Sequence, residues 1–185
     1  MGWRSTANSA ESGERQTFAG RPPRHEDDVL EVCALLRAAL VGLGLSLGPF
    51  VVDGGRVDDV DATADTADGD TIQLQVVRAA QEQVWRQLGR EGQASSMTTD
   101  AELALAVVDA VKHKHGKYPM EQRARLVLAV DAIRAPGFAL DGVVQRLRAD
   151  YRVELAEAGF RAVWLIGPSH QQVHLLVSAD HDRPL

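Results

Sequence analysis

Seven aspartates within residues 53–70 form the densest concentration of chemical groups in this sequence: Asp53, Asp58, Asp59, Asp61, Asp65, Asp68 and Asp70. Carboxylates at this density repel one another unless water or a cation neutralises them, and their hard oxygens suit Mg²⁺ or Mn²⁺. A calcium-binding loop does not fit, because placing Gly69 at its sixth position puts Ala64 at the first, where an oxygen ligand is required. The last three aspartates are typical of a solvated turn. Asp59 and Asp61 instead lie in an expected strand, where aspartate is disfavoured, and are candidate metal ligands.

Two glutamines follow on the next expected strand, residues 71–78. A period of two sorts its side chains onto two faces, with Ile72, Leu74 and Val76 on one and Gln73, Gln75 and Val77 on the other. If the glutamines are buried, their amides need hydrogen-bond partners, and if they face solvent they need no special role. Both alternatives stay open.

A basic cluster occupies the end of an expected helix and the segment after it: Lys112, His113, Lys114, His115, Lys117, Arg123 and Arg125. These cations are typical of a site for a phosphate backbone, beside which Tyr118 would offer a stacking face. Cations in a last helical turn also complement the helix dipole with no ligand at all. His113 and His115 diverge by about 200° on a helix, which makes them a poor metal-binding pair.

The elements that position these residues are read from hydrophobic periodicity. An acidic cluster at residues 26–28 begins an amphipathic helix that ends in the Gly42/Gly44 region. Three short strands follow at residues 49–53, 56–62 and 71–78, and Gly54–Gly55 forms a tight turn between the first two. A short helix is expected at residues 80–90. Thr99 and Glu102 then form a capping-box pattern for a helix that reaches about His115, with Gly116 as its C-terminal cap.

The last part of the chain alternates strands and helices. Residues 126–130 (LVLAV) are typical of a central strand covered on both faces. After Pro136–Gly137 a helix is expected to carry Leu140 through Leu155 toward the core, and strands at residues 162–166 and 172–177 complete the chain. The order predicts a single α/β domain with a mixed central sheet flanked by helices, in which an early antiparallel meander precedes strands that alternate with helices. We expect a flexible tail at residues 1–25, the domain at 26–180 and a C-terminal tail at 181–185.

Composition narrows the class of protein. Hydrophobic residues at 45% and charged residues at 25% indicate a globular chain, and the formal charge of -6 argues against a protein that coats nucleic acid non-specifically. Cys33 is the only cysteine, which excludes an intrachain disulfide and favours a core residue in a reducing cytoplasm. No apolar stretch reaches the length of a membrane span, and no phosphate-binding P-loop, dinucleotide fingerprint or nucleophile elbow is present.

The helix, the strand with acidic residues and the strand with a polar-x-polar stripe, followed by helix and strand, resemble the PD-(D/E)XK restriction-endonuclease-like superfamily. The stretches EQVWRQLGREG, KHKHGKY and LVLAVDA look like degenerate members of that group, and the resemblance covers roughly residues 27–131. It implies a restriction-endonuclease-like fold and a Mg²⁺- or Mn²⁺-dependent nuclease site. Metal and base in such a site stabilise the charge that develops on the scissile phosphate.

Carried over to this chain, the resemblance makes Asp59 or Asp61 the first metal ligand, puts Gln73 or Gln75 in the position of the glutamate, and makes Glu31 an accessory carboxylate. It thus assigns Asp61, Gln73 and Gln75 to catalysis. The sequence departs from the pattern because glutamine brings no negative charge, and the lysine position falls on Gln75 or Val77.

We therefore expect a degenerate nuclease-like domain that binds nucleic acid, with weak or absent cleavage. The residues expected to bind nucleic acid are Lys112, Lys114, Lys117, Tyr118 and Arg123. The alternative is a non-catalytic module of the same fold that binds a protein partner or forms a homodimer.

Overall fold

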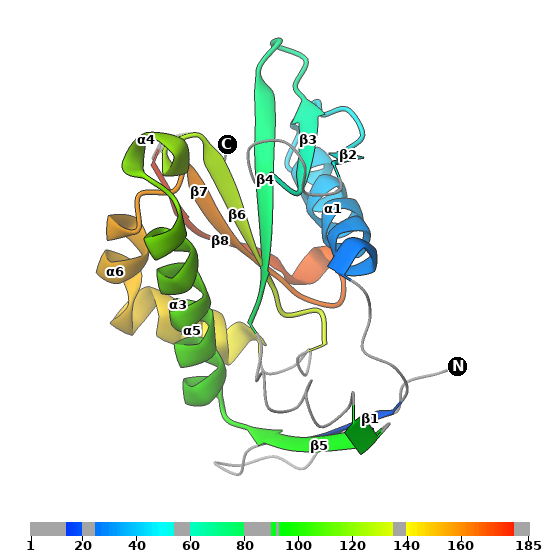
Figure 1. The fold of residues 1–185 in the computed structure, drawn as a ribbon, viewed down its shortest axis with the longest axis vertical. Helices are drawn as coiled ribbons and strands as arrows, with labels where there is room; N and C mark the ends of the chain where they lie inside the picture. The colour runs from blue at the N-terminus through cyan, green and yellow to red at the C-terminus, as the bar shows by residue number, and fades with distance from the viewer. Residues whose placement is uncertain are drawn as a thin grey trace.

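A computed structural model describes residues 14–19, 25–53, 60–79, 90–91, 93–134 and 140–179 of the chain. Its centre is a six-stranded mixed sheet with the strand order β2-β3-β4-β6-β7-β8 (Figure 1). The strands are β2 (Val51–Val52), β3 (Ala62–Asp65), β4 (Thr71–Arg78), β6 (Leu126–Asp131), β7 (Ala162–Ile166) and β8 (Val173–Ser178). β2, β3 and β4 form an antiparallel meander, β4, β6 and β7 run parallel, and β8 is antiparallel to β7.

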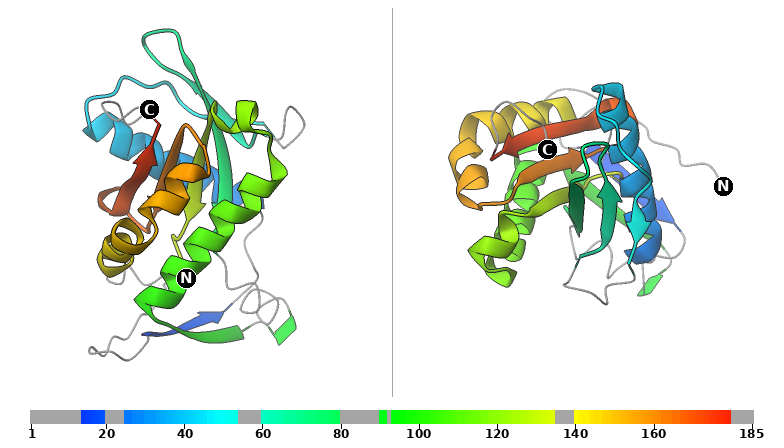
Figure 2. Two further views of the ribbon diagram at one scale, coloured as in Figure 1. Left: turned by 90° about the vertical axis from the view of Figure 1, so that its left-hand side faces the viewer. Right: turned by 90° about the horizontal axis from the view of Figure 1, so that it is seen from above.

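Helices cover both faces of this sheet (Figure 2). α1 (His25–Gly42) packs on one face. The other face carries α3 (Asp100–Lys117), α5 (Leu140–Asp150) and α6 (Arg152–Glu157). The short helix α4 (Met120–Arg123) connects α3 to β6, and the 3₁₀ turn η1 (His170–Gln172) precedes β8. The described residues therefore form a three-layer α/β arrangement, and the predicted mixed sheet with flanking helices is confirmed.

β6 is the centre of the hydrophobic core because all six of its residues are buried. Val127 and Ala129 pack in the cluster beneath α1, whereas Leu126, Leu128 and Val130 pack in the cluster beneath α3 and α5. This alternation is what the continuous apolar run predicts for a strand covered on both faces.

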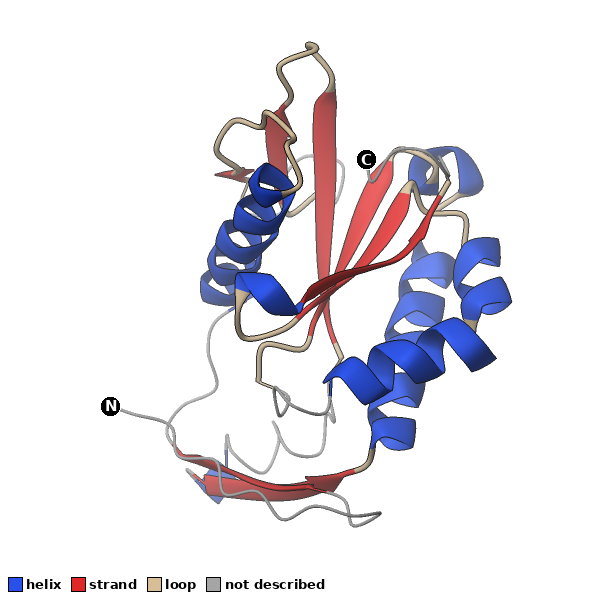
Figure 3. Cartoon of the chain, turned by 180° about the vertical axis from the view of Figure 1, so that it is seen from behind, coloured by secondary structure: helices blue, strands red, loops and turns tan. Residues whose placement is uncertain are grey.

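A second, two-stranded sheet joins β1 (Glu14–Ala19) to β5 (Gln93–Thr98) in antiparallel register. It lies beyond one end of the main sheet and leads directly into α3 (Figures 1 and 3). Part of the segment predicted to be a tail is therefore a strand. The partner strand β5 was not predicted either, because its sequence, QASSMT, shows no strong alternation of apolar and polar residues.

The predicted boundaries need three corrections. β3 begins at Ala62 and extends to Asp65, so Asp61 precedes this strand instead of lying within one. α3 has the predicted capping box at Thr99 but continues through Gly116 to Lys117, and Tyr118 is its extended C-terminal cap. The helix expected to run through Leu155 is divided into α5 and α6, because Tyr151 leaves the helical conformation at φ -126° and ψ 7°.

Several predictions lie outside the described residues, among them the turn at Gly54–Gly55, most of the strand at residues 56–62, nearly all of the helix at residues 80–90 and the C-terminal tail at 181–185. Among the helices that are described, none is long and apolar enough to cross a membrane.

Candidate functional site

Asp61 occupies the position where the antiparallel pairing of β3 with β4 ends. Its amide donates a hydrogen bond to the Leu74 carbonyl at 2.9 Å, one residue before β3 begins, and its carbonyl accepts one from the Asp53 amide at 3.1 Å. The residue is only 8% exposed. The backbone therefore fixes Asp61 firmly and directs its side chain along β4.

The carboxylate of Asp61 replaces a missing backbone partner of β4. In a strand, backbone groups two residues apart point to the same side. The Leu74 carbonyl faces the Asp61 amide, so the Val76 amide faces the same side, beyond the point where β3 ends. Asp61 Oδ2 accepts this amide hydrogen at 2.7 Å, and it also accepts a hydrogen bond from Gln75 Nε2. Asp61 Oδ1 lies 3.2 Å from His25 Nε2, at the first residue of α1.

Gln75 connects Asp61 to the helical layer on the other side. Its side chain is 3% exposed, and its carbonyl oxygen Oε1 accepts a hydrogen bond of 2.7 Å from the Tyr118 hydroxyl. A glutamine amide has separate donor and acceptor ends, so the donor end meets the carboxylate and the acceptor end meets the phenol. We call His25, Asp61, Gln75 and Tyr118 the Asp61 network. The open question about Gln75 is thereby answered, since the amide is buried and fully partnered.

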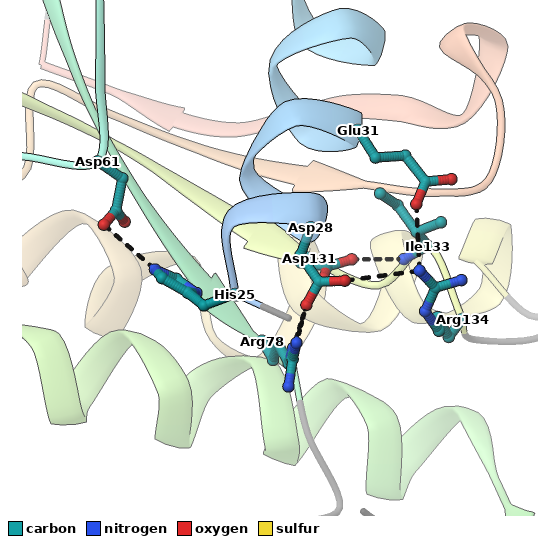
Figure 4. A network of polar contacts seen from close by, with 8 residues as sticks. All are labelled: His25, Asp28, Glu31, Asp61, Arg78, Asp131, Ile133 and Arg134. Atoms are coloured by element: carbon teal, nitrogen blue, oxygen red, sulfur yellow. Dashed lines mark hydrogen bonds and ion pairs between the residues drawn. The ribbon is translucent and has the colours of Figure 1, made fainter. Parts of the chain in front are cut away.

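The other residues expected at this site are arranged differently. Gln73 shares the face of Gln75 but is half-buried and lies in register with Thr63, nearer the turn that follows β3. Glu31 points away from Asp61 and contacts Arg134 Nη2 at 3.2 Å (Figure 4). Asp59 lies outside the described residues. Of the expected residues that the structure describes, only Asp61 and Gln75 are brought together.

This donor set does not fit a divalent metal ion. Both oxygens of Asp61 already have partners, Gln75 adds no negative charge, and its carbonyl oxygen is directed at Tyr118. Mg²⁺ requires oxygen ligands that are free to enter its coordination shell. Within the part of the chain that the structure describes, no three histidine, cysteine, aspartate or glutamate side chains form a group that could hold a metal.

The basic end of α3 is partly a helix cap. Arg123 Nη1 donates to the carbonyls of His115 and Tyr118, at 2.9 and 2.7 Å, which satisfies acceptors at the end of the helix. The ammonium groups of Lys114 and Lys117 lie 5.9 and 5.3 Å from the centre of the Tyr118 ring. Tyr118 is only 4% exposed, so its ring is not the stacking face that the sequence suggested. Exposed cations remain at Lys112 and Lys117, and Lys112 lies 3.7 Å from Glu154.

A second polar cluster lies beside the first turns of α1 and was not predicted as a site. It comprises Asp28, Glu31, Arg78, Asp131 and Arg134, and we call it the arginine cluster (Figure 4). Asp28 is 2% exposed and pairs with Arg78. The sequence assigned Asp28 only to the helix dipole. The sequence feature that could have indicated this cluster is Asp131, an acidic residue at the end of the otherwise apolar strand β6.

Burial is the largest influence on the pKa values of two groups, the Asp131 carboxyl and the Cys33 thiol. It raises the pKa of Asp131 to about 6, and the nearby Asp28 carboxylate adds to this effect, while the Ile133 amide, Arg134 and Arg78 oppose it. Burial and the Asp61 carboxylate raise the pKa of the Cys33 thiol to about 12. Cys33 is therefore an inert core residue, as its apolar neighbours predicted.

No protein-family model, curated protein or solved structure matches this chain.

Proposed function

We propose that this chain is a degenerate nuclease-like module of the PD-(D/E)XK type that binds nucleic acid without cleaving it. The observation that carries this proposal is the direct contact between Asp61 and Gln75. The sequence resemblance puts these residues in the positions of the two metal-binding acids. In this chain one acid is replaced by an amide that donates to the other.

The order of the elements supports the same proposal. The helix α1, the antiparallel meander β2–β3–β4, the helix α3 and the strand β6, which is parallel to β4, occur in this order along the chain, with β5 before α3 and α4 after it. The resemblance rests on this order, with an acid beside the second strand and a polar stripe on the third. Asp61 and Gln75 meet where those two strands adjoin.

The hydrogen bonds of the site support the proposed absence of cleavage. A metal ion bound to Asp61 would have to displace His25, the Val76 amide or Gln75, and would gain only one charged ligand among the described residues. Removing the metal removes the main source of charge stabilisation for a phosphodiester transition state. The remaining function of such a domain is binding, for which the exposed cations at the end of α3 are suited.

Binding is tested by fluorescence anisotropy with labelled single- and double-stranded DNA and RNA at several salt concentrations. Lys117→Glu is expected to weaken binding and to reduce the slope of log K against log salt by about 1. Arg90→Glu is the matched control, because Arg90 is also exposed but precedes β5, which leads to the opposite end of α3. Absence of binding at low salt, or equal losses in both variants, would refute the binding surface and favour a protein-interaction module.

Cleavage is tested separately with supercoiled DNA and millimolar Mg²⁺ or Mn²⁺. The expected result is no nicking and no rise in the melting temperature with either metal. Nicking that disappears in Asp61→Ala would show that the site is active and would overturn the non-cleaving part of the proposal.

A further inference from the structure

Two buried carboxylates of the arginine cluster lie near the same two arginines. Asp28 comes from the first turns of α1 and Asp131 is the last residue of β6, and they are 2% and 7% exposed. Arg78 ends β4 directly opposite Asp131 in the parallel register. Arg134 follows Asp131 after a short turn. The cluster therefore joins α1 to the ends of two neighbouring strands (Figure 4).

The two carboxylates divide their partners unequally. Arg78 contacts Asp28 Oδ2 through both Nε and Nη2, and Arg134 Nη2 lies 3.5 Å from Asp28 Oδ1. Asp131 Oδ1 accepts a hydrogen bond of 2.9 Å from the Ile133 amide. No arginine contact to Asp131 occurs among the described residues, although Arg78 and Arg134 lie close enough to influence its ionisation.

Ionised Asp131 therefore opposes the contact that anchors α1. Its buried charge forms no ion pair with any of the described residues, and it repels the Asp28 carboxylate, through which α1 is held to Arg78 and Arg134. Neutral Asp131 retains the Ile133 hydrogen bond through Oδ1 and no longer repels the Asp28 carboxylate. The two protonation states thus differ in how firmly α1 is held.

We propose that Asp131 is a proton-operated control on the packing of α1 against the sheet, which is tight when its carboxyl is neutral and looser when it is ionised. Because His25 at the start of the same helix contacts Asp61, this packing also determines how firmly His25 covers the Asp61 network. The inference depends on the cluster alone and holds whether or not the chain binds nucleic acid.

The direction of the effect follows from linkage. Burial in the packed state raises the pKa of Asp131 from 3.8, the ordinary value of a solvated carboxyl, to about 6. The packed state therefore binds the proton more tightly than an opened state in which the carboxyl reaches solvent. The stabilising contribution is complete below 3.8 and is lost as the pH rises through 6. Between about pH 5.5 and about pH 7.5 the equilibrium for packing changes by about fourfold.

Other charged groups face this position and must be separated from it. Asp28 and Glu31 come from α1, Arg78 from β4 and Arg134 from the segment after β6, whereas the β7 residue paired with Asp131 is the apolar Ile166. His25 is on α1 as well, and its contact with Asp61 becomes an ion pair when the imidazole is protonated. A His25→Gln variant removes this second source of pH dependence.

The test is amide hydrogen exchange followed by NMR on the full chain, with rates corrected for the intrinsic effect of pH. For the amides of residues 29–36 in the unmodified protein, protection is expected to be about fourfold greater at about pH 5.5 than at about pH 7.5. Asp131→Asn should keep the higher protection at both pH values, since asparagine can accept the Ile133 hydrogen bond. Asp68→Asn, in an exposed turn, and His25→Gln should retain the pH dependence.

The proposal fails if Asp131→Asn retains the pH dependence, or if His25→Gln abolishes it. A carboxyl ¹³C titration of the unmodified protein gives an independent measurement that requires no folded variant. A midpoint near 6 for Asp131 supports the proposal, and a midpoint below about 4.5 overturns it.

Discussion

The Asp61 network and the arginine cluster both hold the beginning of α1 to the sheet, but they satisfy buried acids in different ways (Figure 4). Asp61 receives hydrogen bonds from a backbone amide and a neutral side-chain amide. Asp28 instead pairs with Arg78 and Arg134, whereas Asp131 accepts a hydrogen bond from the Ile133 amide, and burial raises its pKa to about 6. Hydrogen-bond donors therefore satisfy the Asp61 carboxylate, whereas the buried charge of an ionised Asp131 is only partly stabilised by its surroundings.

This difference separates permanent structure from an adjustable contact. Three partners around one carboxylate are lost together if Asp61 is removed, so the network acts as a rigid connection from α1 through β4 to Tyr118. In the arginine cluster, the Asp131 carboxylate forms no ion pair with either arginine, and a single proton neutralises its charge. The following substitutions test this contrast, from the largest expected effect to the smallest.

Asp61→Ala should have the largest effect, a loss of about 3 kcal/mol in the free energy of unfolding. The Val76 amide and the Gln75 amide group would remain buried without an acceptor. Urea unfolding followed by circular dichroism measures the change. Asp68→Ala provides the control because Asp68 lies in an exposed turn, and equal losses in the two variants would show that Asp61 is not a structural connection.

Gln75→Glu should destabilise the protein by about 2 kcal/mol at neutral pH, because it places a second carboxylate against Asp61 in a buried site. The loss should diminish on acidification, as one of the two carboxyls takes up a proton. Gln73→Glu, on the same face but half-buried and nearer the turn, should change stability much less.

The same pair of variants also tests metal binding. If the amide of Gln75 is what prevents binding, millimolar Mn²⁺ should raise the melting temperature of Gln75→Glu and not of the unmodified protein. A rise in the melting temperature of the unmodified protein would contradict the conclusion that the Asp61 site does not fit a divalent metal ion.

Tyr118→Phe should cost about 1 kcal/mol, since it removes one neutral hydrogen bond and leaves the buried Gln75 carbonyl oxygen without its phenolic donor. Thermal unfolding monitored by calorimetry measures the loss. Combining Tyr118→Phe with Asp61→Ala should give less than the sum of the single effects, because both act on Gln75. Strict additivity would show that the network does not act as a unit.

Glu31→Gln should have the smallest effect, about 0.5 kcal/mol or less. Its contact with Arg134 is half exposed, and solvent screens such ion pairs. The loss should disappear at high salt in the same unfolding assay. A loss as large as that of Asp61→Ala would mean that the exposed part of the arginine cluster carries much more of its stability than burial indicates.

The sequence predicted the contents of the candidate site better than its arrangement. Gln75 and Asp61 were both expected at the site and do meet. Gln73 and Glu31 were expected with them and lie elsewhere. Residue type identified the candidates, but the point at which β3 ends decided which of them came together.

Tyr118 illustrates a different limit of sequence reasoning. An aromatic residue beside several lysines is typical of a nucleic-acid surface, and the lysines do lie over its ring. Yet the extended conformation at the end of α3 turns the side chain inward, so its hydroxyl reaches Gln75. The direction of a residue at a helix end depends on one pair of backbone angles, which local composition does not specify.

The sequence alone determined the helices α1 and α3, the buried strand β6 and the alternation of faces along β4. These features follow from periodicity and capping, which act over a few neighbouring residues. The tertiary structure decided which polar groups meet, since Asp61 and Gln75 are 14 positions apart and Asp28 and Arg134 are 106 apart. Such contacts depend on strand order and register, which are set by the packing of the whole sheet.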